Sequence, residues 1–326
     1  MPSLTLVLQL LLESAAPSSR FAPYINALPA SFSIPLCAFS PDDLLALAPS
    51  RAAEAAIKTL RATARDYTHI YSLLHRNKIP GLPASLLSWD NYVWATAVAM
   101  TRQNQIPAGK GTQCALVPVW DMCNHSPGPA TTAVGLSADG EVVVESKAMR
   151  DFEEGEAITM SYGERPNVEL LLYSGFVQTD NEYDKVALDL RLTKEMALAK
   201  FKANVVLGKV NMTVEELEGE QGWIVPLTVD ASNESAERAL GVARVMVARK
   251  ESVGRLLKGG EESMRKPLEG EEEDKARRVV REAAERKVQE YKEVREGVSK
   301  AAQELIGKLH EEEKKVYQHV LACLET

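Results

Sequence analysis

The sequence predicts an α+β fold in which short strands occupy one region and helices dominate the rest. Five short runs of β-forming residues, separated by turn signals, lie in the middle of the chain. Helix-forming residues with helical periodicity dominate much of the first hundred residues and again the segment beyond Leu192. We therefore expect a mixed domain followed by an all-α domain.

Size and charge restrict the classes of function that fit the chain. At 326 residues it is long enough for two domains, and 45% hydrophobic with 26% charged residues is a soluble globular balance. The formal net charge of -8 argues against a broad phosphate-binding surface, so we expect no nucleic-acid partner. The apolar run from Leu4 to Leu12 is open to interpretation as a signal-peptide core, but no Lys or Arg precedes it. A buried helix is favoured there, and no membrane segment is expected.

Cysteine usage indicates a reducing compartment. Cys37, Cys114, Cys123 and Cys323 show no C-x-x-C spacing, which favours free thiols over a disulfide framework and leaves no zinc site. We therefore expect a cytoplasmic protein, with the nucleus as a further compartment, and no bound metal.

Helices are expected along much of the first hundred residues. Residues 42–76 are Ala-rich with apolar residues three and four positions apart, which predicts two helices. Ser40-Pro41 is a typical helix start, with a polar cap and a proline in the first turn. A Pro/Gly break at residues 80–83 precedes a further expected helix at residues 88–105.

The expected strands are short and close together. They comprise residues 115–119, 133–136, 141–146, 157–161 and 185–192. Ala138-Asp139-Gly140, between the second and third of them, predicts a hairpin turn.

From residue 261 onward the chain is very rich in Glu, Lys and Arg. Its apolar residues form a stripe along a helix, made of Val280, Val288, Tyr291, Val294, Val298, Leu305, Leu309, Val316 and Val320. We expect an amphipathic helical hairpin with solvated charged faces. A free coiled coil is less favoured, because Gly297 and Gly307 interrupt the pattern at roughly 1 kcal/mol each.

Two motifs carry the functional signal. In VPVWDMCNHSPGP, residues 117–129, an Asn-His pair follows an apolar run, and in SYGERPNVELLLYSGF, residues 161–176, Tyr162 precedes a glycine. By itself an Asn-His pair is more often a core histidine with satisfied hydrogen bonds than a site. The two motifs together reverse that preference.

These motifs resemble those of the SET-domain methyltransferases, and MTRQNQIP, residues 100–107, resembles the actin-histidine N-methyltransferase branch. The resemblance implies a SET-domain β-fold with a pseudoknot in residues 1–178, including a helical insertion at about residues 41–105. It implies an all-α domain like the substrate-binding domain of Rubisco lysine methyltransferases in residues 179–326. We also expect the SET domain to be N-terminally incomplete, because a glycine-bearing strand that holds the cofactor would precede Leu4.

The resemblance implies S-adenosylmethionine as the cofactor and gives roles to particular residues. Tyr162 and Asn104 match the catalytic positions, with the tyrosine at the rim of a methyl-transfer pore and the amide on the target imidazole. The positions that bind the cofactor are matched by Arg102, Asp121, Met122, Cys123, Asn124, His125, Ser174, Gly175 and Phe176. The positions that bind the substrate are matched by Gln103, Asn104, Trp120 and Arg165.

Some of these side chains also have structural interpretations. Phe176 is of a residue type that usually belongs to the core, and Tyr162 suits a strand end with its ring packed. Gln103 and Arg165 fit equally well as surface polar residues. Position within the motifs favours the functional interpretation for Tyr162 and Phe176.

Histidine as the target has a physical rationale. An imidazole with a pKa near 6.5 is largely neutral at pH 7, whereas a lysine with a pKa near 10.4 must first lose a proton. A side-chain amide that bonds one ring nitrogen determines which nitrogen presents its lone pair. In lysine-directed members of the family that the chain resembles, an aromatic or other apolar residue tends to replace this Asn. The resemblance therefore implies a histidine target for Asn104 with Trp120.

We expect a monomeric protein-histidine N-methyltransferase that acts on actin. Two alternatives remain open at this point. One is a protein-lysine N-methyltransferase of the same fold, and the other is a catalytically inactive module that still binds actin or another partner.

Overall fold

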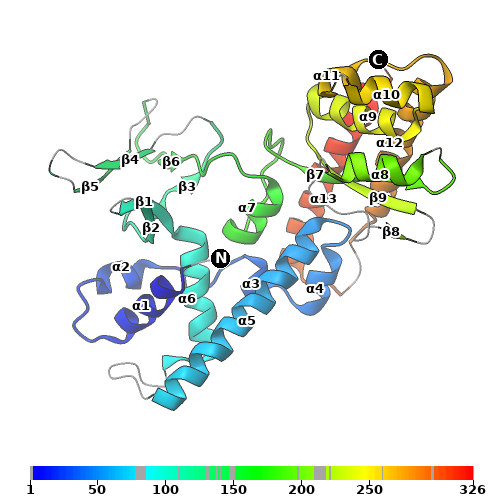
Figure 1. Cartoon of the computed structure of the whole chain (residues 1–326). Helices are drawn as coiled ribbons and strands as arrows, with labels where there is room; N and C mark the ends of the chain where they lie inside the picture. The colour runs from blue at the N-terminus through cyan, green and yellow to red at the C-terminus, as the bar shows by residue number, and fades with distance from the viewer. Residues whose placement is uncertain are drawn as a thin grey trace. The chain divides into compact units, whose positions relative to one another are not determined.

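The computed structural model describes residues 3–77, 86–108, 111–128, 132–136, 139, 141–146, 151–196, 198–208, 218–219, 222–258, 260–294 and 297–325. The chain divides into two compact units. Unit 1 consists of Met1–Leu44, Glu54–Arg165 and Glu169–Phe176. Unit 2 consists of Leu45–Ala53, Pro166–Val168 and Val177–Thr326 (Figure 1).

Helices dominate the first hundred residues, as expected. They are α1 (Leu4–Ala15), α2 (Ala22–Ala27), α3 (Pro35–Ala38), α4 (Pro41–Ala46), α5 (Arg51–Asn77) and α6 (Trp89–Arg102). The opening apolar run lies in α1, which buries Val7, Leu10 and Leu11 in a core shared with α6. The predicted pair of helices in residues 42–76 is confirmed as α4 and α5.

Local side-chain caps determine where two of these helices begin. Ser40 accepts a hydrogen bond from the Asp43 backbone N–H at 3.2 Å, and the Asp43 carboxylate accepts one from the Ser40 N–H at 2.9 Å. This reciprocal cap at the start of α4 confirms the predicted helix start. At the start of α6 the Ser88 hydroxyl accepts a hydrogen bond from the Asn91 backbone N–H at 3.1 Å.

The helix expected at residues 88–105 ends earlier, at Arg102. Gln103 is extended, with a ψ of 141°, and the chain continues directly into a strand. Residues 104–108 instead pair with the hairpin partner at residues 111–115, where the backbone groups that face the partner strand find hydrogen-bond partners.

The strands of unit 1 form two-stranded ladders. β1 (Asn104–Ala108) pairs antiparallel with β2 (Gly111–Ala115), and β4 (Thr132–Leu136) pairs antiparallel with β5 (Val142–Ser146). β3 (Asn124–His125) pairs parallel with β6 (Thr159–Met160). The strands predicted at 133–136 and 141–146 are confirmed, whereas that at 157–161 shrinks to the two residues of β6. Residues 80–83, Pro129, Ala138 and Gly140 lie outside the described residues.

The strand predicted at residues 115–119 is wrong. β2 ends at Ala115, and the chain turns at Pro118 into the 3-10 helix η2 (Trp120–Met122). Val119 has a φ of 72°, which an extended strand does not allow. β1 was not predicted, because Pro107 and polar residues obscure its pattern.

Unit 2 combines a small sheet with helices. β7 (Val186–Thr193), β9 (Gly222–Val229) and β8 (Glu218–Gly219) form a sheet in the order β7-β9-β8. The helices are α8 (Ala199–Gly208), α9 (Asn233–Val247), α10 (Lys250–Lys258), α11 (Gly260–Arg265), α12 (Glu271–Glu290) and α13 (Lys300–Cys323). The strand predicted at 185–192 is confirmed as β7, and β9 corrects the prediction that the second domain is all-α. In β9 buried and more exposed residues alternate along its pairing with β7, a pattern that Gly222 and Pro226 hide in the sequence.

The predicted helical hairpin is confirmed as α12 and α13, which pack on each other. Val280, Leu309, Val316 and Val320 of the apolar stripe are all buried. Gly297 lies between the two helices with a φ of 97°, which suits a turn, whereas Gly307 is inside α13. No helix within the described ranges is both long enough and apolar enough to cross a membrane.

Candidate active site

The parallel pairing of β3 with β6 brings the two sequence motifs together. Asn124 lies opposite Thr159 and His125 opposite Met160, and the Ser126 N–H donates to the Met160 carbonyl at 2.9 Å. Two short segments separated by more than thirty residues therefore run side by side. Tyr162 follows β6 directly.

Tyr162 is held at both ends by the Asn-His motif. Its backbone N–H donates to His125 Nδ1 at 3.1 Å, and its hydroxyl donates to the Cys123 carbonyl at 2.9 Å. When His125 is neutral, an accepting Nδ1 places the ring proton on Nε2. Burial raises the pKa of Tyr162, so the phenol is neutral at pH 7 and its hydroxyl proton points to Cys123.

Arg102, the last residue of α6, meets Asp121 in η2. Arg102 Nη1 donates to the Asp121 carbonyl at 2.8 Å and lies 3.9 Å from Asp121 Oδ1. The Asp121 carboxylate is fully buried, and burial raises its pKa. Asp121 Oδ1 and Arg102 Nε are both buried without a hydrogen-bond partner among the described residues.

The residues that follow α6 enter the same region from β1. Asn104 Nδ2 donates to the Arg102 carbonyl at 2.9 Å, so the amide nitrogen faces the helix end and the amide oxygen faces the opposite way. Gln103 Oε1 accepts from the Ser3 N–H at 3.2 Å, which ties this side chain to the start of α1.

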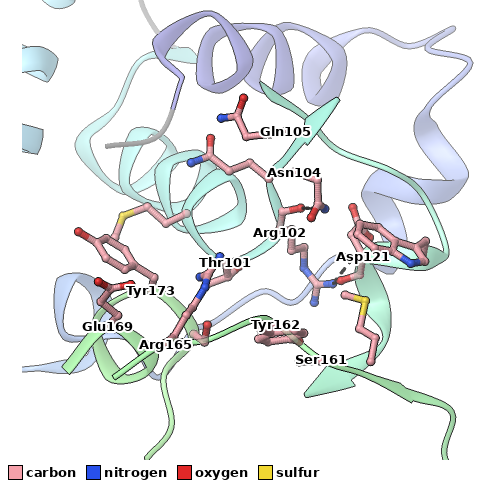
Figure 2. A pocket seen from close by; sticks show the side chains of 15 residues that line it. Thr101, Arg102, Asn104, Gln105, Asp121, Ser161, Tyr162, Arg165, Glu169 and Tyr173 are labelled. Carbon is pink, nitrogen blue, oxygen red and sulfur yellow. Dashed lines mark hydrogen bonds and ion pairs between the residues drawn. The ribbon is translucent and has the colours of Figure 1, made fainter. Parts of the chain in front are cut away.

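These side chains line a cavity of about 570 Å³ in unit 1. In Figure 2, Arg102 reaches toward Asp121 within this cavity. The predicted site residues in its wall are Arg102, Gln103, Asn104, Trp120, Asp121, Tyr162, Arg165 and Ser174. The volume is within the usual range for a small-molecule site.

The sequence analysis missed seven residues of the cavity wall. They are Met100, Thr101, Gln105, Met160, Ser161, Glu169 and Tyr173. A signal existed for the last two, because Glu169 and Tyr173 are four residues apart on α7 (Asn167–Ser174) and so share a helix face. Met100, Thr101, Gln105 and Ser161 lie within the motifs themselves, and Met160 directly precedes the second motif.

Six predicted cofactor-binding residues lie outside the cavity wall: Met122, Cys123, Asn124, His125, Gly175 and Phe176. The Asn124 side chain is exposed, and His125 stacks on Phe176 with ring centroids 5.7 Å apart. Gly175 has a φ of 78°, and a Cβ there would lie 3.2 Å from atoms of Ser33 and Ile34. This geometry explains the glycine by close packing, without a ligand. Within the described residues no group of three or more His, Cys, Asp or Glu side chains is arranged to hold a metal.

Comparison with solved structures identifies the fold. The chain matches the SET domain of Rubisco LSMT bound to lysine and AdoHcy with a TM-score of 0.65, covering 98% of this chain and 74% of that one at 17% identity. Rubisco LSMT bound to AdoMet matches with a TM-score of 0.62 over 98% of this chain and 73% of that one, at 18% identity. The chain has the SET-domain fold. The predicted α+β SET architecture is thus confirmed.

Sequence comparison adds a closer similarity. Over 212 residues the chain is 38% identical to the actin-histidine N-methyltransferases of Danio rerio and Homo sapiens, covering 63% of this chain and 35% of each relative. The chain thus spans about a third of the length of the curated relatives it matches. No family model matches the sequence. The predicted resemblance to the actin-histidine N-methyltransferases is thus confirmed over these 212 residues.

Proposed function

We propose that the protein is a protein-histidine N-methyltransferase that uses S-adenosylmethionine and acts on actin. The observation that carries the proposal is the Asn104 amide, whose nitrogen is engaged by the Arg102 carbonyl in the cavity wall. The similarity to actin-histidine N-methyltransferases supports the choice of substrate.

The cavity suits the amino-acid end of this cofactor. Asp121 Oδ1 is an acceptor without a donor and Arg102 Nε a donor without an acceptor, both buried. The Asp121 carboxylate is fully buried beside the guanidinium, whereas the Arg102 side chain is 17% exposed. Arg102 would hold the carboxylate of the cofactor, and Asp121 would hold the guanidinium in place from behind. Solved neighbours of the same fold are described as bound to AdoMet or AdoHcy.

Asn104 would select the tautomer of the target imidazole. With its nitrogen donating to Arg102, the amide oxygen is the group left to accept a ring N–H. An imidazole bound in this way presents a lone pair on its other nitrogen. Trp120, in the same cavity wall, would restrict the plane of the ring.

Tyr162 would orient the reacting groups without acting as a base. Its raised pKa keeps the hydroxyl protonated, and the Cys123 carbonyl takes that proton's hydrogen bond. The oxygen lone pairs remain available for weak C–H···O contacts with a polarised methyl group. Most of the rate would come from positioning in a shielded cavity.

The cofactor supplies an electrophilic methyl group on a sulfonium. Held by the Asn104 amide, the target imidazole would form the new N–C bond with its lone pair while the C–S bond breaks and that bond's electron pair stays on sulfur. The methylated ring would then release its N–H proton to water. This methyl transfer is balanced without an oxidant or a metal.

We also propose that residues 179–326 form the substrate-binding domain. The helices α9, α12 and α13 of this region build a separate hydrophobic core with the β7-β9-β8 sheet. Such an independent scaffold suits recognition of a folded protein surface.

A lysine methyltransferase is the second candidate, because a solved neighbour of the same fold is described as bound to lysine. The deciding experiment incubates the protein with purified actin and S-adenosylmethionine and maps the product by mass spectrometry. A matched peptide pair, with His or Lys at the target position, separates the two candidates. Methylation of the Lys peptide alone would contradict the histidine assignment, and modification of neither peptide nor actin would support an inactive binding module.

A further inference from the structure

Tyr24 of α2 contacts the candidate site from a distant part of the sequence. Its hydroxyl donates to Asp121 Oδ2 at 2.6 Å across 97 positions of the chain. Tyr24 belongs to neither motif, and it packs against the α1 and α6 core of unit 1. The ring is therefore held in place independently of Asp121.

The hydrogen bond determines which part of Asp121 remains available. With Oδ2 bonded to Tyr24, Oδ1 is the oxygen left without a hydrogen-bond partner among the described residues. This oxygen lies 3.9 Å from Arg102 Nη1. Rotation of the carboxylate to exchange its oxygens would break the short bond to Tyr24.

Tyr24 also favours the ionised form of Asp121. Burial raises the pKa of Asp121, whereas the Tyr24 hydrogen bond and the Arg102 charge act to lower it. The titratable groups that face the carboxylate are Tyr24 from α2, Arg102 from α6 and Tyr162 from the segment after β6. Without the Tyr24 hydroxyl, Arg102 is the side chain that still opposes the effect of burial on the Asp121 pKa.

We propose that Tyr24 is a positioning residue of the cofactor site: it holds Asp121 in one orientation, and the buried Asp121 in turn holds the Arg102 guanidinium that receives the carboxylate of the cofactor. The inference rests on the proposed function, since it requires a ligand with a carboxylate. Tyr24 does not itself touch that ligand and acts through Asp121.

The test is a calorimetric titration of S-adenosylhomocysteine into the wild-type chain, Tyr24→Phe and the control Tyr67→Phe. Tyr67 is a matched control, because its partly buried hydroxyl donates to the Leu87 carbonyl at 3.2 Å beside the same core. Tyr24→Phe is expected to bind roughly tenfold more weakly, because a hydrogen bond to a charged group is lost. The loss should grow as the pH falls, since Asp121 then becomes protonated at a higher pH than in the wild type.

Two further measurements separate positioning from general damage. In an Asp121→Asn background, Tyr24→Phe should cause no additional loss of affinity, because its effect acts through the carboxylate. In the ligand-free protein, carbon NMR of labelled Asp121 should show a higher pKa in Tyr24→Phe than in the wild type and no change in Tyr67→Phe.

The outcomes distinguish this inference from the proposed function. If the wild type binds and Tyr24→Phe matches Tyr67→Phe at every pH, the positioning role is wrong while the proposed function stands. Additive losses in the double variant, or an unchanged Asp121 pKa, would also overturn it. No binding by the wild type would overturn the proposed function and this inference together.

Discussion

Glu313 on α13 makes the stability of unit 2 depend on pH. The residue is 2% exposed, and its carboxylate accepts hydrogen bonds from the Ser50 hydroxyl at 2.8 Å and the Tyr291 hydroxyl at 2.9 Å. Burial nevertheless raises its pKa from 4.5 to about 7. The folded state thus binds this proton more tightly than the unfolded chain. The resulting stabilisation is fully present below about pH 4.5 and is lost as the pH rises through about 7.

The difference between a pKa of 4.5 and one of about 7 corresponds to roughly 3 kcal/mol, at about 1.4 kcal/mol per pH unit. Glu313→Gln keeps the acceptor for Ser50 and removes the buried charge. We expect its free energy of unfolding to match the wild type near about pH 4 and to exceed it by up to about 3 kcal/mol near about pH 8.

Urea denaturation followed by circular dichroism at both pH values measures this difference. Burial also raises the pKa of Asp184 and lowers that of His310, so these groups add to the pH dependence of stability. Only the difference between Glu313→Gln and the wild type isolates the contribution of Glu313. Glu311→Gln on the exposed side of α13 is the control for a change in net charge. A constant difference between Glu313→Gln and the wild type at the two pH values would refute the reasoning.

Three further predictions concern unit 1. Tyr162→Phe should lower turnover roughly tenfold with little effect on cofactor affinity, because it removes only the hydroxyl at the methyl-transfer position; steady-state kinetics and calorimetry that showed equal losses would contradict this division. Asn104→Phe should shift the preference from the His to the Lys peptide, because the tautomer-selecting amide is lost, and an unchanged ratio of rates would count against the tautomer argument. Gly175→Ala should destabilise the chain by roughly 1–3 kcal/mol more than Gly163→Ala, since both have positive φ but only the Cβ at 175 meets neighbouring atoms, at 3.2 Å. Equal melting temperatures of the two glycine variants would exclude that packing cost.

The features that the sequence predicted correctly depend on neighbours in the chain. Ser40 and Asp43 of the reciprocal cap are three positions apart, and β4 and β5, which pair antiparallel, follow each other in the chain. The apolar stripe of α12 and α13 follows from helical periodicity. Each of these signals is contained within a few turns of one element.

The features that it missed depend on distant partners. β9 is defined by its register with β7, in which Val225 lies opposite Leu190, and no local pattern announces that pairing. Asn124 pairs with Thr159 where β3 meets β6, 35 positions away in the chain, and it is exposed. Tyr24 reaches Asp121 from 97 positions away, so no motif contains both residues. Sequence likeness therefore pointed to residues that the structure gathers in the wall of one cavity, whereas the contacts that hold those residues required coordinates.

The end of α6 links the two halves of the proposed reaction through one residue. The last carbonyls of a helix lack partners within the helix, and Asn104 satisfies that of Arg102. The guanidinium of the same Arg102 meets Asp121 on the proposed cofactor side. A shift of the helix end would therefore move the imidazole-binding amide and the carboxylate-binding guanidinium together. Because transfer requires the nucleophile and the methyl group in line, a shared anchor keeps their separation constant, which is the condition that positioning catalysis needs.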